Sequence, residues 1–370
     1  MKRRIVVTGG HVTPALAVID QLQKRRWEIY FIGRRYAMEG DRTLSVESKI
    51  VPQKGVFFEA IEAGRLQRRL TRYTFPALLK VPWGFFQAWR LLRKIRPRII
   101  LSFGGYVSVP VVVMGWLQGV PVVTHEQTTV RGLATRINAV FARRIAVSWP
   151  RTSKYYSAGK VVITGNPIRR GYFEVNEQLF QDLKFKGGRF FILVTGGNQG
   201  SHQINQAIQE ILPRLLQRAD VLHQCGHVER FGDFQGLDEA RRRLPKELRE
   251  RYHLRRYLIE EEMGTFLNKA DLVISRAGAN ITTELMALGK PSLMIPLPSL
   301  QEQKSNAQML ADLGMAEVLA EEEIKPEKLW VVIERMLDNL PFYQKEAIKS
   351  RSLIKKDAAQ RIVELVEKTV

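Results

Sequence analysis

Residues 4–10 read RIVVTGG and residues 190–197 read FFILVTGG, so one strand-then-glycine pattern occurs in each half of the chain. In both places a short run of β-branched and aromatic residues stops at a glycine pair and is followed by a stretch with helical periodicity. Continuous apolar strands that alternate with helices are typical of a parallel sheet covered on both faces. The sequence therefore predicts an α/β protein with two Rossmann-like, doubly wound domains.

The rest of the chain follows the same alternation, and 370 residues leave room for about two domains. Gly165–Asn166–Pro167 lies between the two series and is the expected hinge. We expect an N-terminal domain over residues 1–163, a C-terminal domain over 164–340, and a helical segment over 341–370 that returns to the N-terminal domain. The other predicted elements are strands at 28–32, 99–103, 120–124, 272–275 and 291–296, and helices at 14–26, 75–94, 109–117, 132–141 and 203–218.

Basic residues dominate the charge of the chain, because 58 Lys and Arg against 37 Asp and Glu give a formal charge of +21. Such a surface favours an anionic partner: nucleic acid, anionic lipid or a phosphorylated substrate. Cys225 is the only cysteine, which excludes an internal disulfide and a thiolate-rich metal site. No apolar run approaches the roughly 20 residues of a membrane span and no signal peptide is evident, so we expect a cytoplasmic protein with only peripheral membrane contact.

Glycine turns follow the predicted strands at the positions where doubly wound folds bind ligands. They are Gly9–Gly10, Gly104–Gly105 and Gly196–Gly200, and a fourth junction at 275–279 has small residues. A single turn of this kind is more often a steric strand end than a site, but four across two domains favour anion binding at helix N-termini. None matches a dinucleotide fingerprint or a P-loop, which argues against an NAD enzyme and an ATPase. A nucleotide diphosphate-sugar, bound without a cofactor, suits the pattern.

Polar side chains gather near these turns. His11 follows the first turn directly, and His125–Glu126 follows the strand at 120–124. Glu284 lies one to two helical turns after Gly278, where a carboxylate can accept two ribose hydroxyls. Each residue alone is more often a solvated loop residue or a cap, whereas their shared place at strand ends favours a site.

The sequence shows no evident metal site. None of the six histidines forms a helical i, i+4 pair with an intervening general base, and no Asp-x-Asp motif occurs. The charge of a departing diphosphate would then be met by loop amides, helix N-termini and basic side chains. Arg169 and Arg276 are the candidate cations.

The segment from Arg65 to Arg98 carries ten basic residues and no Asp or Glu, with many aromatic residues interleaved. Part of it can be an ordinary core-facing helix, yet an anionic bilayer would supply partners for both the rings and the cations. Nucleic acid is the competing partner, because aromatic residues and Arg also bind single strands. We place the membrane first, since the glycine turns favour a diphosphate-sugar enzyme.

Eight ordered motifs make the chain resemble the MurG family of peptidoglycan glycosyltransferases over nearly its whole length. They are TGGHVTPALAV at residues 8–18, SFGGYVSVP at 102–110, GVPVVTHEQ at 119–127, GNPIR at 165–169, TGGNQGSHQIN at 195–205, HQCGH at 223–227, SRAGANITTEL at 275–285 and QEQKSNA at 301–307. The resemblance implies a GT-B fold, in which two Rossmann-like domains face each other across a cleft, and it implies no metal.

By this resemblance, the reaction transfers N-acetylglucosamine from UDP-N-acetylglucosamine to the C4 hydroxyl of the muramic sugar of lipid I, which forms lipid II. The C-terminal domain would hold the donor. The resemblance places Leu258 or Ile259 beside the uracil, Glu284 on the ribose, Asn198 and Arg169 near the phosphates, and Gly278, Ala279, Thr282, Gln301 and Gln303 around phosphate or sugar.

The resemblance also assigns the acceptor to the N-terminal domain. The implied acceptor-binding residues are Gly9, Gly10, Gly104, Gly105, Tyr106 and His125. The implied mechanism is an inverting single displacement in which His11 is the first choice of base and Glu126 the second, because a neutral imidazole accepts a proton readily near neutral pH. The resemblance places Phe75, Leu79, Trp83 and Phe86 on the cytoplasmic face of the plasma membrane. It implies no nucleic acid partner, and cell-wall biosynthesis proteins are the candidate protein partners.

Three departures from the family pattern concern mainly the acceptor. The first loop is only Thr8–Gly9–Gly10–His11, Thr128 stands where an Asn usually follows His-Glu-Gln, and Asn198 stands where a Ser is usual. A shorter first loop offers fewer amides to the acceptor diphosphate. Two alternatives stay open: a GT-B enzyme that uses another UDP-sugar or another lipid acceptor, and a non-catalytic basic protein that binds membranes or nucleic acid.

Overall fold

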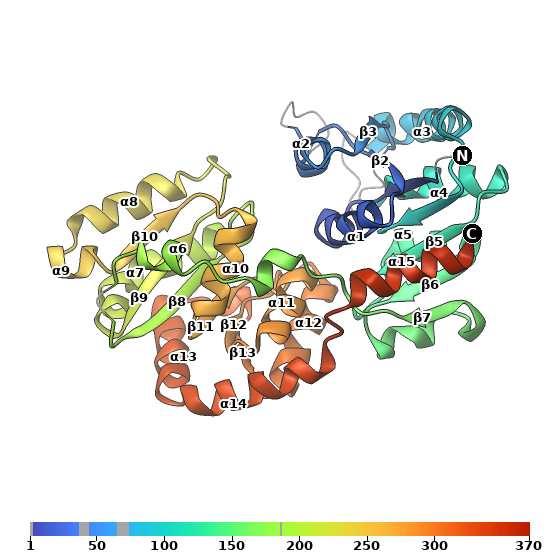
Figure 1. Ribbon diagram of the computed structural model, residues 1–370. Helices are drawn as coiled ribbons and strands as arrows, with labels where there is room; N and C mark the ends of the chain where they lie inside the picture. The colour runs from blue at the N-terminus through green and yellow to red at the C-terminus, as the bar shows by residue number, and fades with distance from the viewer. Residues whose placement is uncertain (1–2, 37–43, 65–73, 186) are drawn as a thin grey trace. The chain divides into compact units, whose positions relative to one another are not determined.

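The computed structural model describes residues 3–36, 44–64, 74–185 and 187–370, without the side chains of residues 74–80 (Figure 1). The chain divides into two compact units: unit 1 contains residues 1–169 and 355–370, and unit 2 contains residues 170–354. Relative to the boundaries expected from the sequence, residues 164–169 lie with unit 1 and residues 341–354 lie with unit 2. Within the C-terminal helical segment, only residues 355–370 pack on unit 1.

Unit 1 is built on a seven-stranded parallel sheet in the order β3-β2-β1-β4-β5-β6-β7. The order runs outward in both directions from β1, as in a doubly wound fold. The strands are β1 (Arg4–Thr8), β2 (Glu28–Gly33), β3 (Phe57–Ala60), β4 (Ile99–Ser102), β5 (Val122–Glu126), β6 (Arg144–Val147) and β7 (Val161–Ile163).

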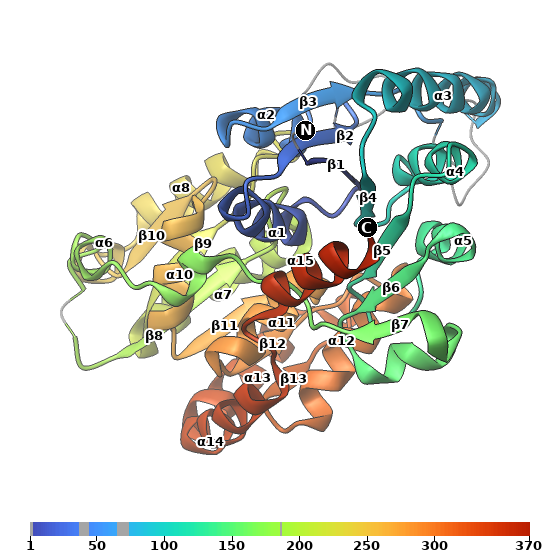
Figure 2. The same cartoon turned by 45° about the vertical axis from the view of Figure 1, so that its right-hand side comes forward.

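Helices cover both faces of this sheet, because neighbouring strand residues point to opposite sides. Ile5 and Val7 pack under α1 (Val12–Lys24), α2 (Val46–Gln53) and α15 (Ala358–Thr369). Val6 packs under α3 (Thr74–Ile95) and α4 (Ser108–Leu117), and α5 (Leu133–Phe141) packs beside α4. Both views show α15, the last helix, lying beside α1, the first (Figures 1 and 2).

Unit 2 repeats the architecture with a six-stranded parallel sheet in the order β10-β9-β8-β11-β12-β13. Its strands are β8 (Phe190–Thr195), β9 (Ala219–Gln224), β10 (Tyr252–Arg255), β11 (Leu272–Ser275), β12 (Ser292–Met294) and β13 (Ala316–Val318). Its helices are α6 (Glu177–Gln181), α7 (His202–Arg218), α8 (Asp233–Arg243), α9 (Lys246–Arg249), α10 (Glu260–Lys269), α11 (Ala279–Leu288), α12 (Gln301–Asp312), α13 (Pro326–Asp338) and α14 (Leu340–Ser350).

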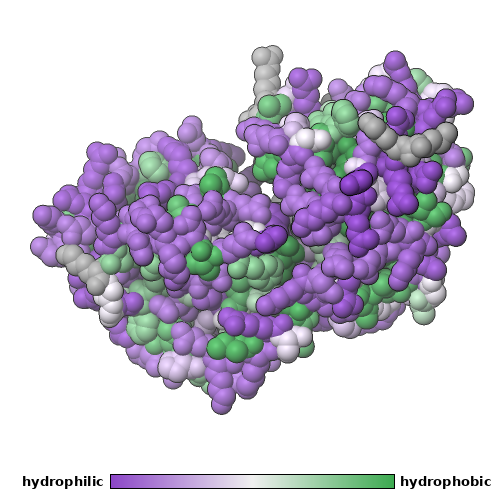
Figure 3. Space-filling view, in the orientation of Figure 1, coloured by the Kyte–Doolittle hydropathy of each residue, from purple (hydrophilic) through white to green (hydrophobic). Residues whose placement is uncertain are grey.

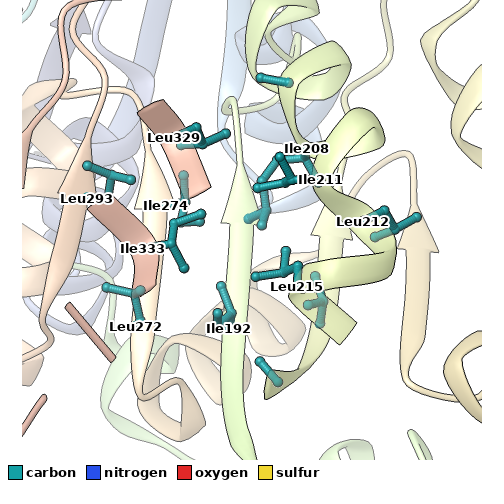
Figure 4. Close-up of a cluster of buried hydrophobic side chains, with 14 of the residues drawn as sticks. Ile192, Ile208, Ile211, Leu212, Leu215, Leu272, Ile274, Leu293, Leu329 and Ile333 are labelled. Atoms are coloured by element: carbon teal, nitrogen blue, oxygen red, sulfur yellow. The ribbon is translucent and has the colours of Figure 1, made fainter. Parts of the chain in front are cut away.

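The core of unit 2 lies where α7 and α13 pack on the central strands of its sheet. Ile208, Ile211 and Leu215 recur at helical spacing on α7 and are buried against Ile192 of β8 (Figure 4). Ile274 of β11 and Ile333 of α13 complete the same cluster.

On the face of the molecule seen in Figure 3, hydrophilic residues predominate, in keeping with the charge of +21. The prediction of two Rossmann-like domains is confirmed.

Candidate functional site

The strand order brings the predicted turns together in pairs. In unit 1 the order reverses between β1 and β4, and these strands end at Gly9–Gly10 and at Gly104–Gly105. In unit 2 it reverses between β8 and β11, which end at Gly196–Gly200 and at Gly278. Open α/β sheets bind ligands at such switch points, beyond the carboxyl ends of the strands. Each unit therefore has one candidate site of this kind.

The two glycine turns of unit 1 touch backbone to backbone. The Gly10 amide donates to the Gly104 carbonyl over 2.9 Å. A Cβ on Gly9 would lie 2.9 Å from the Gly104 oxygen, and a Cβ on Gly105 would lie 2.8 Å from the Gly10 nitrogen. Both residues also have positive φ, so only glycine fits this crossing. The glycines predicted for acceptor binding are therefore required for the two loops to pack this closely.

A cluster of buried polar side chains supports the turn at Gly104–Gly105 from the interior of unit 1. The Asn138 side-chain amide donates to the hydroxyls of Ser102 and Ser108 over 3.0 and 2.8 Å. The Ser108 hydroxyl donates to the Gly105 carbonyl, and the Ser102 hydroxyl accepts from the Gly104 amide. Sequence reasoning missed this cluster; the signal was three polar residues within stretches that are otherwise apolar.

His11 lies at the entrance of α1 with its ring oriented by the neighbouring turn. Its Nδ1 is 2.7 Å from the carbonyl oxygen of Phe103, which can only accept a hydrogen bond. Nδ1 must therefore carry the proton, and in the neutral ring Nε2 has the free lone pair. The ring is half-buried. This tautomer is the one that a proton acceptor at Nε2 requires.

Glu126 is held by its own loop. One carboxylate oxygen accepts from the amide and hydroxyl of Thr128, and the other accepts from the Gly132 amide over 2.9 Å and from the Tyr156 hydroxyl. The side chain is buried. These bonds fix the loop that leads into α5, so the carboxylate serves the loop geometry.

His125 lies in the interior of unit 1. Its Nε2 is 3.2 Å from the Gly165 carbonyl and 3.2 Å from the Ser148 hydroxyl, and its ring packs on Phe103. Burial lowers the pKa of His125 to about 4. The neutral ring thus ties the end of β5 to the predicted hinge. Tyr106, the remaining predicted acceptor residue, is half-buried against the core on the α4 side.

Unit 1 is expected to lose stability as the pH falls from 6.5 toward 4. The unfolded His125 binds a proton near its ordinary pKa of 6.5, whereas the folded side chain does so only near 4, so acid favours the unfolded chain. The loss is roughly 1 kcal/mol per pH unit in this window. Chemical denaturation of wild type and His125→Gln, whose amide can still reach Gly165, would measure it. Equal slopes for the two proteins would contradict the assignment.

Most residues predicted to bind the donor lie in unit 2. There the turn at Gly196–Gly200 packs closely on the loop at Cys225–Gly226. A Cβ on Gly200 would lie 1.9 Å from the Cys225 carbonyl oxygen, and one on Gly226 would lie 2.2 Å from the Gly200 nitrogen. Asn198 is exposed on the same turn. Burial raises the pKa of the Cys225 thiol to about 11, so this residue is a loop support and no nucleophile.

The N-terminus of α11 is open to an anion. Its N-cap, Gly278, has an extended backbone, and among the described residues no side chain caps the helix. The first amides of the helix, beginning at Ala279, are therefore left to solvent or to a ligand. The Thr282 hydroxyl donates to the Gly278 carbonyl, which stiffens the turn. Glu284 is buried on the same helix, one and a half turns from its start.

The remaining predicted donor residues are spread over neighbouring strand ends. Leu258 is buried, whereas Ile259 is exposed at the start of α10, so only Ile259 presents a side chain to a ligand. Gln303 accepts from the Leu297 amide over 3.0 Å, and Gln301 is exposed at the first position of α12. Arg169 belongs to unit 1, unlike the other predicted donor residues.

Arg276, the second candidate cation, is committed to the interior of unit 2. Its guanidinium donates to the Ser201 hydroxyl over 2.6 Å and to the Ile295 carbonyl over 3.1 Å, and it pairs with Glu321. Its side chain is 10% exposed, and burial lowers its pKa. It joins the ends of three strands and does not present a free charge to a diphosphate. Arg169 remains the candidate.

The predicted membrane residues lie on α3. Trp83 and Phe86 are 51% and 46% exposed, and their stacked rings continue to Trp89, with centroids 5.4 and 5.9 Å apart. The side chains of Phe75 and Leu79 lie outside the described residues. Sequence reasoning missed Trp116, which is 51% exposed at the end of α4.

Within the described ranges, no group of three or more His, Cys, Asp or Glu side chains could hold a metal ion. Over the same residues, no helix combines the length and the apolar composition needed to cross a membrane.

Comparison with known proteins identifies the family. Residues 6–147 match the glycosyltransferase family 28 N-terminal domain, and residues 191–362 match the family 28 C-terminal domain. A UDP-N-acetylglucosamine–N-acetylmuramyl-(pentapeptide) pyrophosphoryl-undecaprenol N-acetylglucosamine transferase from Clostridium botulinum is 34% identical over 376 residues, covering 99% of both chains. A protein of the same name from Geobacillus thermodenitrificans is 35% identical over 380 residues, covering 100% of this chain and 99% of its own.

Solved structures agree on the fold. The crystal structure of MurG from Acinetobacter baumannii superposes with a TM-score of 0.74 at 24% identity and covers 99% of both chains. The paired switch-point loops, both family 28 domains and the full-length relatives lead to one conclusion. The chain belongs to the MurG family of glycosyltransferases and has the two Rossmann-like domains of a GT-B fold.

Proposed function

We propose that the chain transfers N-acetylglucosamine from UDP-N-acetylglucosamine to the C4 hydroxyl of the muramic sugar of undecaprenyl-diphosphate-linked lipid I, forming lipid II. The observation that carries the proposal is end-to-end similarity to relatives named for this reaction, at 34–35% identity. The paired glycine loops at the switch point of each unit supply one anion-binding edge for each diphosphate substrate.

In this proposal unit 2 binds the donor. The open N-terminus of α11 at Gly278–Ala279 and the exposed turn at Asn198 offer amides to the diphosphate. Glu284 takes the ribose hydroxyls and Ile259 lies by the uracil, while Thr282, Gln301 and Gln303 shape the sugar pocket. Unit 1 binds the acceptor at the crossing of Gly9–Gly10 with Gly104–Gly105.

The proposed chemistry is one inverting displacement. The C4 oxygen of the acceptor attacks the anomeric carbon, the bond from that carbon to the UDP oxygen breaks, and UDP leaves with the electron pair. The C4 hydroxyl proton passes to Nε2 of His11, whose Nδ1 is already occupied by its bond to the Phe103 carbonyl. Glu126 is the second candidate for this proton.

The negative charge that develops on the leaving UDP needs stabilisation. We assign it to the helix N-terminus of α11 and to Arg169, and we propose that no metal ion takes part. Transfer in the presence of excess chelator would then proceed at the rate measured without it. A rate that collapses in chelator and returns on addition of a divalent ion would remove this part of the proposal.

The experiment that tests the function is the transfer of radiolabelled N-acetylglucosamine to a lipid I analogue. Product formation from UDP-N-acetylglucosamine but not from UDP-glucose supports the proposal. A thermal-shift series with both UDP-sugars, NAD and single-stranded DNA separates it from the alternatives. Donor binding without transfer to lipid I would favour another lipid acceptor, and stabilisation by DNA alone would favour the non-catalytic alternative.

We further propose that unit 1 rests on the anionic cytoplasmic face of the plasma membrane through α3. The exposed ladder of Trp83, Phe86 and Trp89 has Arg93 above its last ring, 5.0 Å from the centroid. An aromatic row beside cations suits the interface of an anionic bilayer. Trp116 of α4 extends the apolar area.

The double variant Trp83→Ser/Phe86→Ser is expected to bind phosphatidylglycerol vesicles at least about tenfold more weakly, because two partly inserted rings are lost. Vesicle co-sedimentation at fixed ionic strength measures this. The matched control is Phe342→Ser, which removes an equally exposed ring from α14 of unit 2. Equal binding by wild type and both variants would refute the membrane role of α3.

A further inference from the structure

A chain of buried and half-buried polar side chains lies behind the glycine turn of unit 2. Asp233, the first residue of α8, accepts from the Asn205 side-chain amide over 2.8 Å with one oxygen. Its other oxygen is 2.6 Å from Nδ1 of His202. The Asn205 amide also donates to the Cys225 carbonyl over 3.0 Å. One carboxylate thus reaches the first turn of α7 and, through Asn205, the loop after β9.

The directions of the hydrogen bonds around Asn205 are determined. Burial lowers the pKa of His223 to about 3, so its ring is neutral. The Cys225 carbonyl can only accept, so Asn205 turns its NH₂ group to that carbonyl and its oxygen to Nε2 of His223, 3.0 Å away. Nε2 therefore donates, and Nδ1 accepts from the Tyr252 hydroxyl over 2.8 Å. The Asn205 NH₂ group also faces Asp233. The Asp233 oxygen that faces this NH₂ group is the acceptor of the bond.

The carbonyl that Asn205 holds is the one that the glycine turn approaches most closely. Gly200 and Gly226 pack so tightly that a Cβ on Gly200 would lie 1.9 Å from the Cys225 oxygen. A rotation of the Cys225–Gly226 peptide would therefore push against Gly200. The polar chain holds the carbonyl of this peptide, and the Gly226 amide donates to the Arg256 carbonyl over 3.1 Å. Together these bonds fix the loop against which the turn at Gly196–Gly200 packs.

The loop between β9 and α8 is fastened to the same turn from outside. The amides of His227 and Val228 donate to the carbonyls of Asn198 and Gln199 over 3.2 and 3.4 Å. The Phe231 ring stacks on His202 with centroids 4.3 Å apart. Asp233 lies at the end of this loop, and its bonds to His202 and Asn205 join the loop to the first turn of α7, directly after the glycine turn.

We propose that Asp233 is a positioning residue for the sugar donor: through Asn205 and His202 it holds the loop amides of residues 196–200 in their binding geometry before the donor arrives. The inference rests on the proposed function, because it takes this turn as part of the UDP-sugar site. A preorganised loop binds its ligand without the entropic cost of ordering. Asp233 is expected to act on donor binding and hardly on the chemical step.

The test compares Asp233→Ala with wild type in steady-state transfer and in calorimetric titration with UDP-N-acetylglucosamine. The expected result is a rise of about tenfold in both KM and Kd for the donor, with kcat within about twofold of wild type. Asp233→Asn keeps the volume and one acceptor oxygen, and it is expected to raise KM by about threefold. This milder variant carries the test if the alanine variant does not fold.

Asp238→Ala is the matched control, because Asp238 lies on the same helix and pairs only with Arg241 and Arg242 among the described contacts. Its KM should equal that of wild type. An unchanged donor KM in the folded Asp233 variants, or a fall in kcat alone, would overturn the inference, whatever the melting temperature does. If wild type itself binds no UDP-sugar, the proposed function fails; if wild type binds and the Asp233 variants bind equally well, only this inference fails.

Discussion

Replacing His11 with alanine is expected to lower kcat by roughly two to four orders of magnitude, which is the usual contribution of a positioned general base. The KM for UDP-N-acetylglucosamine should change little, because His11 lies in unit 1 and the proposed donor residues, apart from Arg169, lie in unit 2. The hydrogen bond from Nδ1 to the Phe103 carbonyl leaves Nε2 as the only ring nitrogen able to take the acceptor proton. Steady-state kinetics with each substrate varied in turn would measure both constants.

Two comparisons make the result specific to the base. His11→Gln keeps a polar side chain but supplies no basic nitrogen, so it should be as slow as the alanine variant. Glu126→Gln tests the second candidate, and its effect should be smaller and accompanied by a loss of stability, since Glu126 accepts from the Gly132 amide and from Thr128. A Glu126→Gln enzyme that is slower than His11→Ala, with unchanged stability, would transfer the role of base to Glu126.

Replacing Gly200 with alanine is expected to lower the free energy of unfolding of unit 2 by roughly 4 kcal/mol. A φ of +84° costs an L-residue on the order of 1–2 kcal/mol. The new methyl group would also lie 1.9 Å from the Cys225 carbonyl oxygen, so the two loops would have to separate. Chemical denaturation measures the loss, and donor titration should show weakened binding in the molecules that still fold.

Gly232→Ala separates the clash from the backbone strain. Gly232 also has a positive φ, +65°, but a Cβ there meets no atom within 4 Å among the described residues. Its cost should be roughly 1 kcal/mol. Similar losses in the two variants would mean that the contact between Gly200 and the Cys225 loop contributes nothing to stability.

Most central strands of the fold were predicted from the sequence, although β6 and β9 were not, and the edge strands were missed. The strands predicted at 4–8 and 272–275 coincide with β1 and β11, where apolar runs lie in the middle of each sheet. All four edge strands, β3, β7, β10 and β13, escaped prediction. They have only three or four residues each, so the period alone does not distinguish them from loops. β11 also has four residues, but the small-residue turn at 275–279 marks its end.

One central strand was displaced for a different reason. The strand predicted at 120–124 is β5, Val122–Glu126. Its last residues, His125 and Glu126, are polar in composition, yet they pair with Ala146 and Val147 of β6 and are buried. The His125 side chain finds its partners in Gly165 and Ser148, far along the chain, whereas the Glu126 carboxylate is bonded mainly by the loop that follows the strand. The burial of His125 therefore cannot be inferred from the local sequence.

The loops of the site were predictable because glycine is required wherever two backbones cross. The residues behind the loops were not, since Asn138 and Asp233 are separated by long stretches of chain from the turns they support, and Asn205 contacts the distant Cys225 loop. Arg276 illustrates the converse error: an arginine at a strand end suggested a phosphate ligand, but Glu321 lies beside it and pairs with it.

The return of α15 to unit 1 has a consequence for synthesis on the ribosome. Ile362, Val363 and Val366 complete the cluster that buries Ile5 and Leu16, although the whole of unit 2 is translated in between. Unit 2 is one continuous segment and can fold as it emerges. The first-made strands of unit 1 must wait for the last-made helix, so an apolar face stays uncovered through most of translation and is the natural place for a chaperone to bind the nascent chain.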